Sequence, residues 1–332
     1  MPLTRRAFTT LGLALAAAPA KAQQLDKVSF GTNWVAEAEH GGFYQAVADG
    51  TYQKYGLDVT IVPGGPQVNN RMLLLAGKIE FFMSANSLQS FDAVAQNIPT
   101  IVVAASFQKD PQVLLAHPGA AEKFEDLKKL TLLVSSEGLQ TYYKWMQAEF
   151  GFTENQTKPY TFNPQPFLVD KNSAMQGYVT SEPFAVEKAG VKPKIFLLAD
   201  HGFNTYSTLI ETRRELVEKR PDLVQRFVDA SAIGWYSYLY GDNKAANALI
   251  RKQNPEMTDE LIAYSISKMK DYGIVDSGDT LKDGIGAMSD ARMASFFDKM
   301  VKAGVVKPSV DFRKSYTLQF VNKGVGLDLR PK

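Results

Sequence analysis

The chain has 332 residues, of which 45% are hydrophobic and 22% charged, and its net charge is +2. This length allows one large or two medium globular domains with a sizeable core. The net charge is close to neutral and the sequence has no basic block. Both observations argue against a nucleic-acid partner. The absence of cysteine excludes disulfides, thiol nucleophiles and thiolate metal sites, and the histidines, His40, His117 and His201, are not spaced as metal ligands. We therefore expect no metal and no cofactor.

The first residues, 1–22, have the features of an export signal. A basic start precedes a short apolar run from Leu11 to Ala18, and an A-x-A pattern ends the segment. The apolar run is too short to span a bilayer. Arg5 and Arg6, followed by Phe8, favour the twin-arginine route, and an ordinary Sec signal with two chance arginines is the alternative. Because no cysteine follows the run, we predict a soluble periplasmic protein that is not a lipoprotein.

Strands and helices are predicted to alternate after the signal. The apolar periodicity predicts strands at 26–31, 57–65, 79–85 and 100–107 and helices at 41–55, 67–77 and 86–96. Asn86 is the expected cap of the last helix. Such alternation is typical of an α/β fold with largely parallel strands.

A second block of alternating elements begins after His117. Its predicted elements are helices at 121–130 and 139–151 and strands at 131–136, 176–181 and 194–200. A strand at 206–211 then precedes a mainly helical tail, with helices at 221–240, 243–253, 258–272 and 283–303.

This order predicts two α/β lobes. Residues 23–117 would form the first part of lobe one, 118–202 lobe two, and 203–332 the rest of lobe one, with the helical tail packed on it. The chain would pass from lobe one to lobe two near His117 and return near Gly202. These two crossings would form a hinge, with a cleft between the lobes. Ligands of open α/β sheets bind beyond the carboxyl ends of the strands, so we expect the site in that cleft.

Several stretches of the chain carry a family resemblance. They are HGGFYQAVADGTYQKYGLDVTIVPGG, LLLAGKIEFFMSAN, IPTIVVAASFQKDPQVLLAHP and GYVTSEPF. In this order they resemble the thiamine-pyrimidine-precursor family of periplasmic substrate-binding proteins, a group that includes the nitrate and sulfonate receptors of ABC importers. The resemblance covers most of residues 26–240. It implies a monomeric, type II periplasmic-binding-protein clamshell that delivers a small solute to a permease in the inner membrane.

Two departures from the pattern narrow the expected function. The fungal relatives that make pyrimidines depend on a cysteine-rich motif, which this chain lacks. The sulfonate receptors have a glycine-rich turn for the anion, and the equivalent place here is SSEGLQTYY, with the acidic Glu137. This departure from the pattern of the sulfonate receptors therefore argues against an obligate sulfonate or nitrate ligand.

The predicted cleft combines aromatic, small and polar residues from both lobes. Its predicted members are Trp34, His40, Gly41, Tyr44, Asn86 and Ser87 of lobe one, Gln140, Thr141 and Glu182 of lobe two, and Tyr206 near the second crossing.

The lobe-one residues follow the first strand. Trp34 is expected to stack on a flat ring, with a cap on the core as the alternative. Tyr44 is preferred over Phe43 as the cleft residue, because its hydroxyl needs a polar partner. His40 either gives one hydrogen bond to the ligand or bonds the backbone at a helix start. Gly41 would let a ligand approach a helix N-terminus.

The remaining candidates also have simpler interpretations. Asn86 and Ser87 cap a helix and could also donate to the ligand. Glu182 is expected to accept from ligand amino or ring N–H groups, although a surface acid or a hinge ion pair is the alternative. Tyr206 lines either the cleft or the hinge. Gln140 and Thr141 lie at the start of a predicted helix of lobe two.

These residues suit a planar, pyrimidine-like heteroaromatic solute that is held by hinge closure without a covalent step. The alternatives are an aromatic acid, a sulfonate- or nitrate-type anion, a sensor subunit that reports a ligand to a membrane kinase, and an exported enzyme that uses His40 with Glu182.

Overall fold

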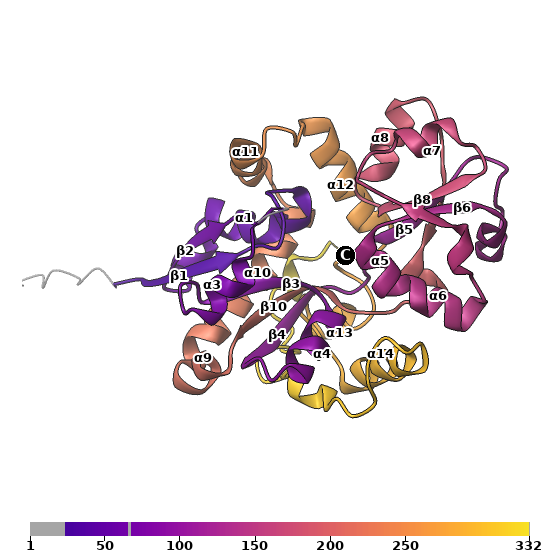
Figure 1. The fold of residues 1–332 in the computed structure, drawn as a ribbon. Helices are drawn as coiled ribbons and strands as arrows, with labels where there is room; N and C mark the ends of the chain where they lie inside the picture. Colours follow the sequence, from indigo (N-terminus) through magenta and orange to yellow (C-terminus); the bar gives the residue numbers. More distant parts are fainter. Residues whose placement is uncertain (1–23, 66–67, 332) are drawn as a thin grey trace, which may run out of the picture.

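The structure, a computed structural model, describes residues 24–65 and 68–331 and consists of two sheets flanked by helices (Figure 1). The predicted export signal lies outside the described residues. The first sheet has the strand order β2-β1-β3-β10-β4. Its strands are β1 (Asp26–Gly31), β2 (Leu57–Val62), β3 (Phe81–Asn86), β4 (Thr100–Phe107) and β10 (Ser207–Arg213). β1 is parallel to β2 and β3, whereas β10 is antiparallel to β3 and β4.

The second sheet has the order β7-β6-β8-β5-β9. Its strands are β5 (Gln112–Ala116), β6 (Thr131–Val134), β7 (Thr157–Pro159), β8 (Ser173–Tyr178) and β9 (Lys194–Leu197). β6 is parallel to β7 and β8, and β5 is antiparallel to β8 and β9. The predicted two-lobed α/β fold is therefore confirmed, with one reversed strand in each sheet.

The helices of lobe one follow its strands. They are the 3-10 helix η1 (Ala38–His40), α1 (Gly41–Ala48), α2 (Thr51–Lys54), α3 (Asn70–Leu75) and α4 (Ser87–Ala95). The single helix predicted at 41–55 is split, because Gly50 adopts a left-handed conformation with φ of 73°. The Asn86 cap is confirmed, since its side chain accepts a hydrogen bond from the Leu88 N–H.

Lobe two is covered by shorter helices. They are η2 (Phe124–Lys129), α5 (Ser136–Gln140), α6 (Tyr142–Phe150), η3 (Glu154–Gln156), α7 (Gln165–Val169), α8 (Glu182–Lys188) and η4 (Leu198–His201). The helix predicted at 139–151 is interrupted at Thr141, where φ of −120° and ψ of −102° end α5 before α6 begins. The helix predicted at 121–130 is a shorter 3-10 helix.

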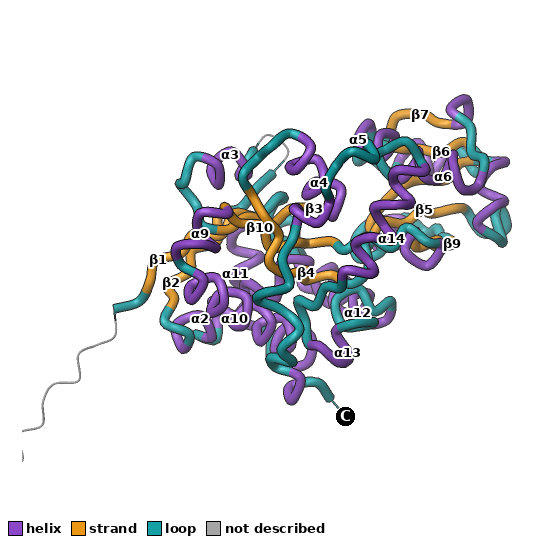
Figure 2. Tube along the Cα trace, turned by 90° about the horizontal axis from the view of Figure 1, so that it is seen from below, coloured by secondary structure: helices purple, strands orange, loops and turns teal. Residues whose placement is uncertain are grey.

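The C-terminal helices contact both lobes. They are α9 (Arg214–Lys219), α10 (Pro221–Tyr240), α11 (Lys244–Gln253), α12 (Asp259–Asp271), α13 (Thr280–Asp283) and α14 (Asp290–Lys302), followed by the 3-10 helices η5 (Phe312–Ser315) and η6 (Leu327–Leu329). α10 packs on α1, as the prediction of a tail on lobe one requires. In addition, Ser265 of α12 donates to the Thr180 carbonyl of lobe two, and α14 lies beside α6 in both views (Figures 1 and 2). The C-terminal helices thus pack on lobe one and also contact lobe two.

The first crossing lies earlier than predicted. β4 ends at Phe107 in the first sheet, and β5 begins at Gln112 in the second, so residues 108–111 make the connection. His117, the predicted crossing point, follows β5, and its Nε2 lies 2.7 Å from the Phe167 carbonyl within lobe two. The return crossing runs from the end of β9 to β10 and includes the expected Gly202.

Candidate ligand-binding site

Two aromatic rings from different lobes lie close together, tilted by 34°. Trp34 lies half-buried in the loop after β1. Its ring centroid is 6.2 Å from that of Phe162, which belongs to the loop between β7 and α7 and is 66% exposed. Phe162 in turn lies 5.5 Å from the buried ring of Tyr160. Trp34 therefore has an exposed aromatic partner from lobe two, in addition to any contact with its own core.

Carboxyl groups of both lobes influence one another's pKa. Glu37 precedes η1, Glu39 lies within it, and Glu182 is the first residue of α8. The pKa of Glu37 is raised well above its usual value by burial and by the carboxylates of Glu39 and Glu182. Burial and the Glu182 carboxylate likewise raise the pKa of Glu39. Burial raises the pKa of Glu182, although its Oε2 accepts from the Tyr178 N–H (2.7 Å) and the Ser181 hydroxyl (2.6 Å).

The negative charge extends to the first crossing and to α5. Burial raises the pKa of Asp110 to about 6, and the Glu137 carboxylate adds to this effect. Burial raises the pKa of Tyr178, and the carboxylates of Asp110, Glu137, Glu37 and Glu182 add to this effect. We call Glu37, Glu39, Asp110, Glu137 and Glu182 the acidic cluster. Within the described part of the chain, its only ion-pair contact is to His40.

His40 does not supply a compensating charge. It is 2% exposed, and burial lowers its pKa to about 3, so the imidazole is neutral at neutral pH. Its Nε2 lies 3.4 Å from Oε1 of Glu37, while Nδ1 has no hydrogen-bond partner among the described residues. The alternative of a bond to the backbone at the helix start is therefore not found, and one ring nitrogen remains unsatisfied.

Gly41 and Tyr44 serve helix packing. A Cβ at Gly41 would lie 2.0 Å from the ring of Tyr238, so the glycine allows α1 to approach α10 closely. This position is therefore closed to a ligand from that side, contrary to the prediction. The Tyr44 hydroxyl donates to Oε1 of Gln253 in α11, and Phe43 packs against Phe30 in the core with a centroid distance of 4.5 Å.

Asn86 and Ser87 are occupied by local structure. Oδ1 of Asn86 accepts from the Leu88 N–H at 3.0 Å. The Ser87 N–H donates to the Tyr206 carbonyl at 3.2 Å and approaches the Thr205 hydroxyl at 3.3 Å. The capping interpretation accounts for Asn86, whereas the Ser87 hydroxyl donates to Sδ of Met293 at 3.7 Å.

The other predicted residues lie at α5 and at the hinge. Gln140 is exposed at the end of α5, and the Thr141 hydroxyl donates to the Glu137 carbonyl at 2.9 Å. Tyr206 lies directly before β10, its hydroxyl donates to Oδ2 of Asp279 at 2.9 Å, and it is 1% exposed.

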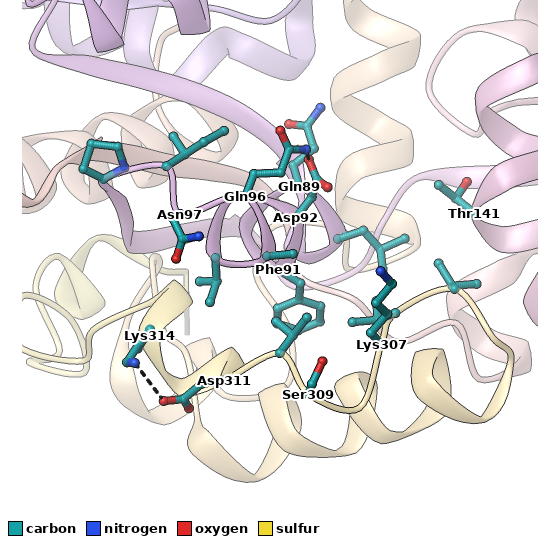
Figure 3. A pocket seen from close by; sticks show the side chains of 18 of the residues that line it. Gln89, Phe91, Asp92, Gln96, Asn97, Thr141, Lys307, Ser309, Asp311 and Lys314 are labelled. Carbon is teal, nitrogen blue, oxygen red and sulfur yellow. Dashed lines mark hydrogen bonds and ion pairs between the residues drawn. The ribbon is translucent and has the colours of Figure 1, made fainter.

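A separate cavity of about 1100 Å³ lies along α4 and residues 305–314, and Figure 3 shows its side chains. Thr141 is the one predicted residue that lines it. Two pairs of its polar groups bind each other: Gln96 donates to Asp92 at 2.7 Å, and Lys314 lies 3.5 Å from Asp311. Neither Trp34 nor Glu182 lines this cavity.

Trp34 and His40 belong to the segment between β1 and α1, His40 contacts Glu37, and this segment adds acidic residues that the sequence analysis did not select. Glu37 and Glu39 stand in the loop that holds Trp34, where the letters AEAEH place two acids beside the selected histidine. Phe162 and Tyr178 carry no comparable signal, because their positions depend on how lobe two approaches lobe one.

Replacing Glu37 by glutamine should stabilise the unliganded protein by about 0.5–2 kcal/mol at neutral to alkaline pH. The pKa of Glu37 is raised in the folded state, so the folded protein holds a proton that the unfolded chain releases, and stability falls as pH rises through that range. Below the usual pKa of glutamate, Glu37 is protonated in both the folded and the unfolded chain. The stability difference between the glutamine variant and the parent should therefore disappear there. Urea unfolding at acid and alkaline pH measures both values. An equal effect at the two pH values would contradict this account.

In the described ranges, no helix is both long and apolar enough to cross a membrane. The same residues include no group of histidine, cysteine, aspartate and glutamate side chains arranged to hold a metal ion.

Comparison with known proteins places this fold in a family. The chain is 22% identical to the riboflavin-binding protein RibY of Chloroflexus aurantiacus over 95% of this chain and 92% of that protein. It superposes on the periplasmic aliphatic sulphonate-binding protein SsuA of Escherichia coli with a TM-score of 0.63, at 13% identity, over 87% and 91% of the two chains. It also superposes on the alkanesulfonate-binding protein SsuA of Xanthomonas axonopodis pv. citri, bound to MOPS, with a TM-score of 0.62 at 12% identity. This superposition covers 89% of this chain and 99% of that chain.

The structural likeness shows the fold of periplasmic binding proteins, and the sequence match is more specific. The family model described as NMT1/THI5 like matches residues 37–246. This range includes Glu37 and Glu39, the whole second sheet and both crossings. This protein therefore belongs to the NMT1/THI5-like family.

Proposed function

We propose that the protein is the solute-binding component of an ABC importer and that it captures a small planar heteroaromatic solute, such as a pyrimidine, between its lobes. The observation that carries this proposal is the approach of Trp34 and Phe162, whose ring centroids lie 6.2 Å apart from different lobes at an interplanar angle of 34°. Stacking on aromatic faces favours a flat ligand. The family and the two-lobed fold support the role in import.

The relatives support different ligands, and the acidic cluster favours one class. The name of RibY describes binding of riboflavin, which is a planar heteroaromatic molecule. The names of the SsuA structures describe sulfonates. A sulfonate needs positively charged or N–H donors, whereas no lysine or arginine among the described residues pairs with the acidic cluster. The cluster therefore supports a ring without a dominant negative charge.

Closure of the lobes supplies the mechanism. A solute that binds first to Trp34 on lobe one would gain the contacts of Phe162 and Glu182 when lobe two approaches. Only this difference in affinity shifts the population towards the closed form, which the permease would recognise. No covalent step is required. The rival enzyme would need a base, but His40, with a pKa of about 3, is a weak base in this environment.

Native mass spectrometry of freshly purified protein, followed by thermal-shift screening, tests this function. Pyrimidines, flavins, aromatic acids and sulfonates form the screen. A planar heteroaromatic compound should raise the melting temperature in a concentration-dependent way. A shift with alkanesulfonates or nitrate and none with ring compounds would overturn the proposed ligand class, while leaving the binding role intact. Turnover of the bound compound would overturn the binding role.

Trp34→Ala should weaken binding of the ligand found in this screen by about tenfold or more, because it removes the lobe-one stacking surface. The melting temperature of the unliganded variant should stay close to that of the parent, since Trp34 is only half-buried. Isothermal titration calorimetry measures the affinity. Tyr55→Leu, which removes another half-buried aromatic ring of lobe one, is the control and should bind normally. Equal affinity for Trp34→Ala and Tyr55→Leu would contradict the assignment of the site.

A further inference from the structure

Gln176 is a buried amide near the end of a strand of lobe two. It lies in β8, two residues before the strand ends at Tyr178, and it is 7% exposed. Its Oε1 accepts hydrogen bonds from the Ser135 N–H at 2.5 Å and from the Tyr142 hydroxyl at 2.9 Å. Because a backbone N–H can only donate, these bonds fix which side of the amide carries the oxygen. Nε2 therefore lies on the side that is turned away from the Ser135 N–H.

The amino group of this amide has no protein partner. Nε2 makes no hydrogen bond within the described part of the chain, although Oε1 makes two. It is also not sealed from solvent, in contrast to the hydroxyl of Thr180, which is buried there without a partner. A donor that is almost surrounded by protein has a cost when it is left unpaired. Gln176 thus holds a fixed donor that an acceptor from outside the protein can reach.

The amide stands at the edge of the second sheet that faces lobe one. β6 ends at Val134, and the amide binds the next residue, Ser135. At the same strand end, the Tyr160 N–H donates to the Val134 carbonyl at 3.0 Å. Two residues further along is Phe162, the ring that lies 6.2 Å from Trp34 of lobe one. Hydrogen bonds along the backbone therefore connect the amide to the aromatic pair of the candidate site.

The first crossing reaches the same edge. Residues 108–111 lead from lobe one into β5, whose first residue, Gln112, pairs with Tyr178 at the end of β8. Gln176 and Tyr178 lie on one face of the sheet, because side chains alternate along a strand. The amide is therefore close to the point where the chain enters lobe two. Ligands of open α/β sheets bind beyond strand ends of this kind.

We infer that Gln176 binds the solute by donating from Nε2 to a ring carbonyl oxygen, so that the solute is an oxo-substituted planar heteroaromatic ring. This inference rests on the proposed function, since it concerns the chemistry of the ligand in the same site. A carbonyl oxygen projects beyond the edge of its ring, so it can meet the amide while the ring stacks on Trp34. The fixed amide also selects against an amino group in that place, because two donors would then oppose each other.

An uncharged oxygen suits this amide better than an anionic group. The neighbouring donors, the Ser135 N–H and the Tyr142 hydroxyl, are both occupied by Oε1. The amide therefore offers a single neutral donor group. Sulfonates and carboxylates are usually held by several donors or by charged ones.

Two pyrimidines that differ in one group test the inference. Pyrimidin-2-one has a ring carbonyl where 2-aminopyrimidine has an amino group, and both are uncharged at neutral pH. Isothermal titration calorimetry with the purified protein should show pyrimidin-2-one binding at least about tenfold more tightly. Gln176→Met, which removes the donor, should bring the ratio of the two affinities close to one. Gln176→Glu should do the same at mildly alkaline pH, because an ionised carboxylate has no donor.

The variants separate a contact with the solute from a local structural role. Gln176→Glu keeps an oxygen that accepts from Ser135 and Tyr142, so it serves where the methionine variant does not fold. Tyr142→Phe removes one donor to Oε1 but leaves Nε2 in place, and it should keep the preference for pyrimidin-2-one. Gln147→Met, a matched change at a half-buried glutamine of α6, should also keep it. A purely structural role would weaken both compounds alike and leave their ratio unchanged.

The outcomes also distinguish this inference from the proposed function. Equal affinities in the parent protein, or tighter binding of 2-aminopyrimidine, would overturn the carbonyl and leave a planar ligand standing. A preference that persists in both Gln176 variants would overturn the assignment to Gln176. Tighter binding of benzenesulfonate than of pyrimidin-2-one would overturn the uncharged oxygen. Failure of both pyrimidines to bind at millimolar concentrations would likewise overturn the inference, while native mass spectrometry still decides whether the protein carries a solute.

Discussion

Replacing Arg292 by methionine should lower the free energy of unfolding by about 2–4 kcal/mol and loosen the hinge. Arg292 lies in α14, and its guanidinium binds both chain segments that connect the lobes. It donates to the Gln108 carbonyl of the first crossing and to the carbonyls of Asn204 (3.0 Å) and Thr205 (3.1 Å) of the second. Without it, backbone acceptors in these segments lose their charged donor, and Gln108 and Thr205 are both buried.

The position of Tyr206 adds to the effect. The Arg292 guanidinium lies 4.0 Å above the ring of Tyr206, whose hydroxyl donates to Asp279 and accepts from the Ser289 N–H at 2.9 Å. Burial lowers the pKa of Arg292, but arginine stays charged at any physiological pH. The one side chain thus holds the crossings to each other and to the C-terminal helices.

Lys299→Met is the matched control for Arg292→Met. Lys299 is also in α14 but binds only the second crossing, through the Gly202 carbonyl at 2.7 Å and Oδ1 of Asn204 at 3.1 Å. It should cost less stability and leave the hinge angle unchanged. Urea unfolding measures stability, and fluorescence energy transfer between dyes on the two lobes measures the spread of interlobe distances. Equal spreads in both variants would show that Arg292 does not set the hinge.

Local sequence patterns were sufficient for most elements of lobe one and for the long helix of the tail. β4 and α10 have the predicted bounds, because an apolar run that starts with β-branched residues and a proline at the helix start are strong local signals. Gly284, with φ of 88°, ends α13, and the helix expected at 283–303 begins only at Asp290. A glycine in a helical pattern does not reveal from sequence alone whether its φ is positive.

Sheet membership could not be predicted in the same way. β5 lies only a few residues after β4, and nothing within Gln112–Ala116 indicates that it pairs with β8 and β9 in the other sheet. Pairing between strands far apart in sequence is decided by the packing of the whole lobe. The predicted crossing at His117 was wrong for this reason.

The same limit applies to the candidate site. Trp34, His40 and Glu182 could be selected because loops at strand ends and helix starts are where ligands bind in this class of fold. Gly41 had the signal of an open helix N-terminus, but the ring of Tyr238, distant in sequence, occupies the space beside it. The acidic cluster depends on the approach of two lobes, which no local pattern encodes.

Phe227→Ala should destabilise the protein by about 3–5 kcal/mol, because it removes the centre of the lobe-one core. Phe227 of α10 is fully buried. Its ring stacks on Phe81 of β3 with a centroid distance of 4.1 Å and an interplanar angle of 7°, and on Tyr52 of α2 at 5.3 Å and 9°. Phe30 of β1 lies 5.5 Å away. One side chain therefore joins two strands and two helices.

Phe162→Ala removes the same atoms from an exposed site and serves as the control. Its free energy of unfolding should change by less than about 0.5 kcal/mol, because surface substitutions rarely do more, while ligand binding should weaken. Phe227→Ala should lose stability in urea and bind normally once folded at low temperature. If Phe227→Ala lowers the free energy of unfolding by no more than Phe162→Ala does, the core around α10 does not hold β1 in place. It would then not position the loop after β1 that carries Trp34.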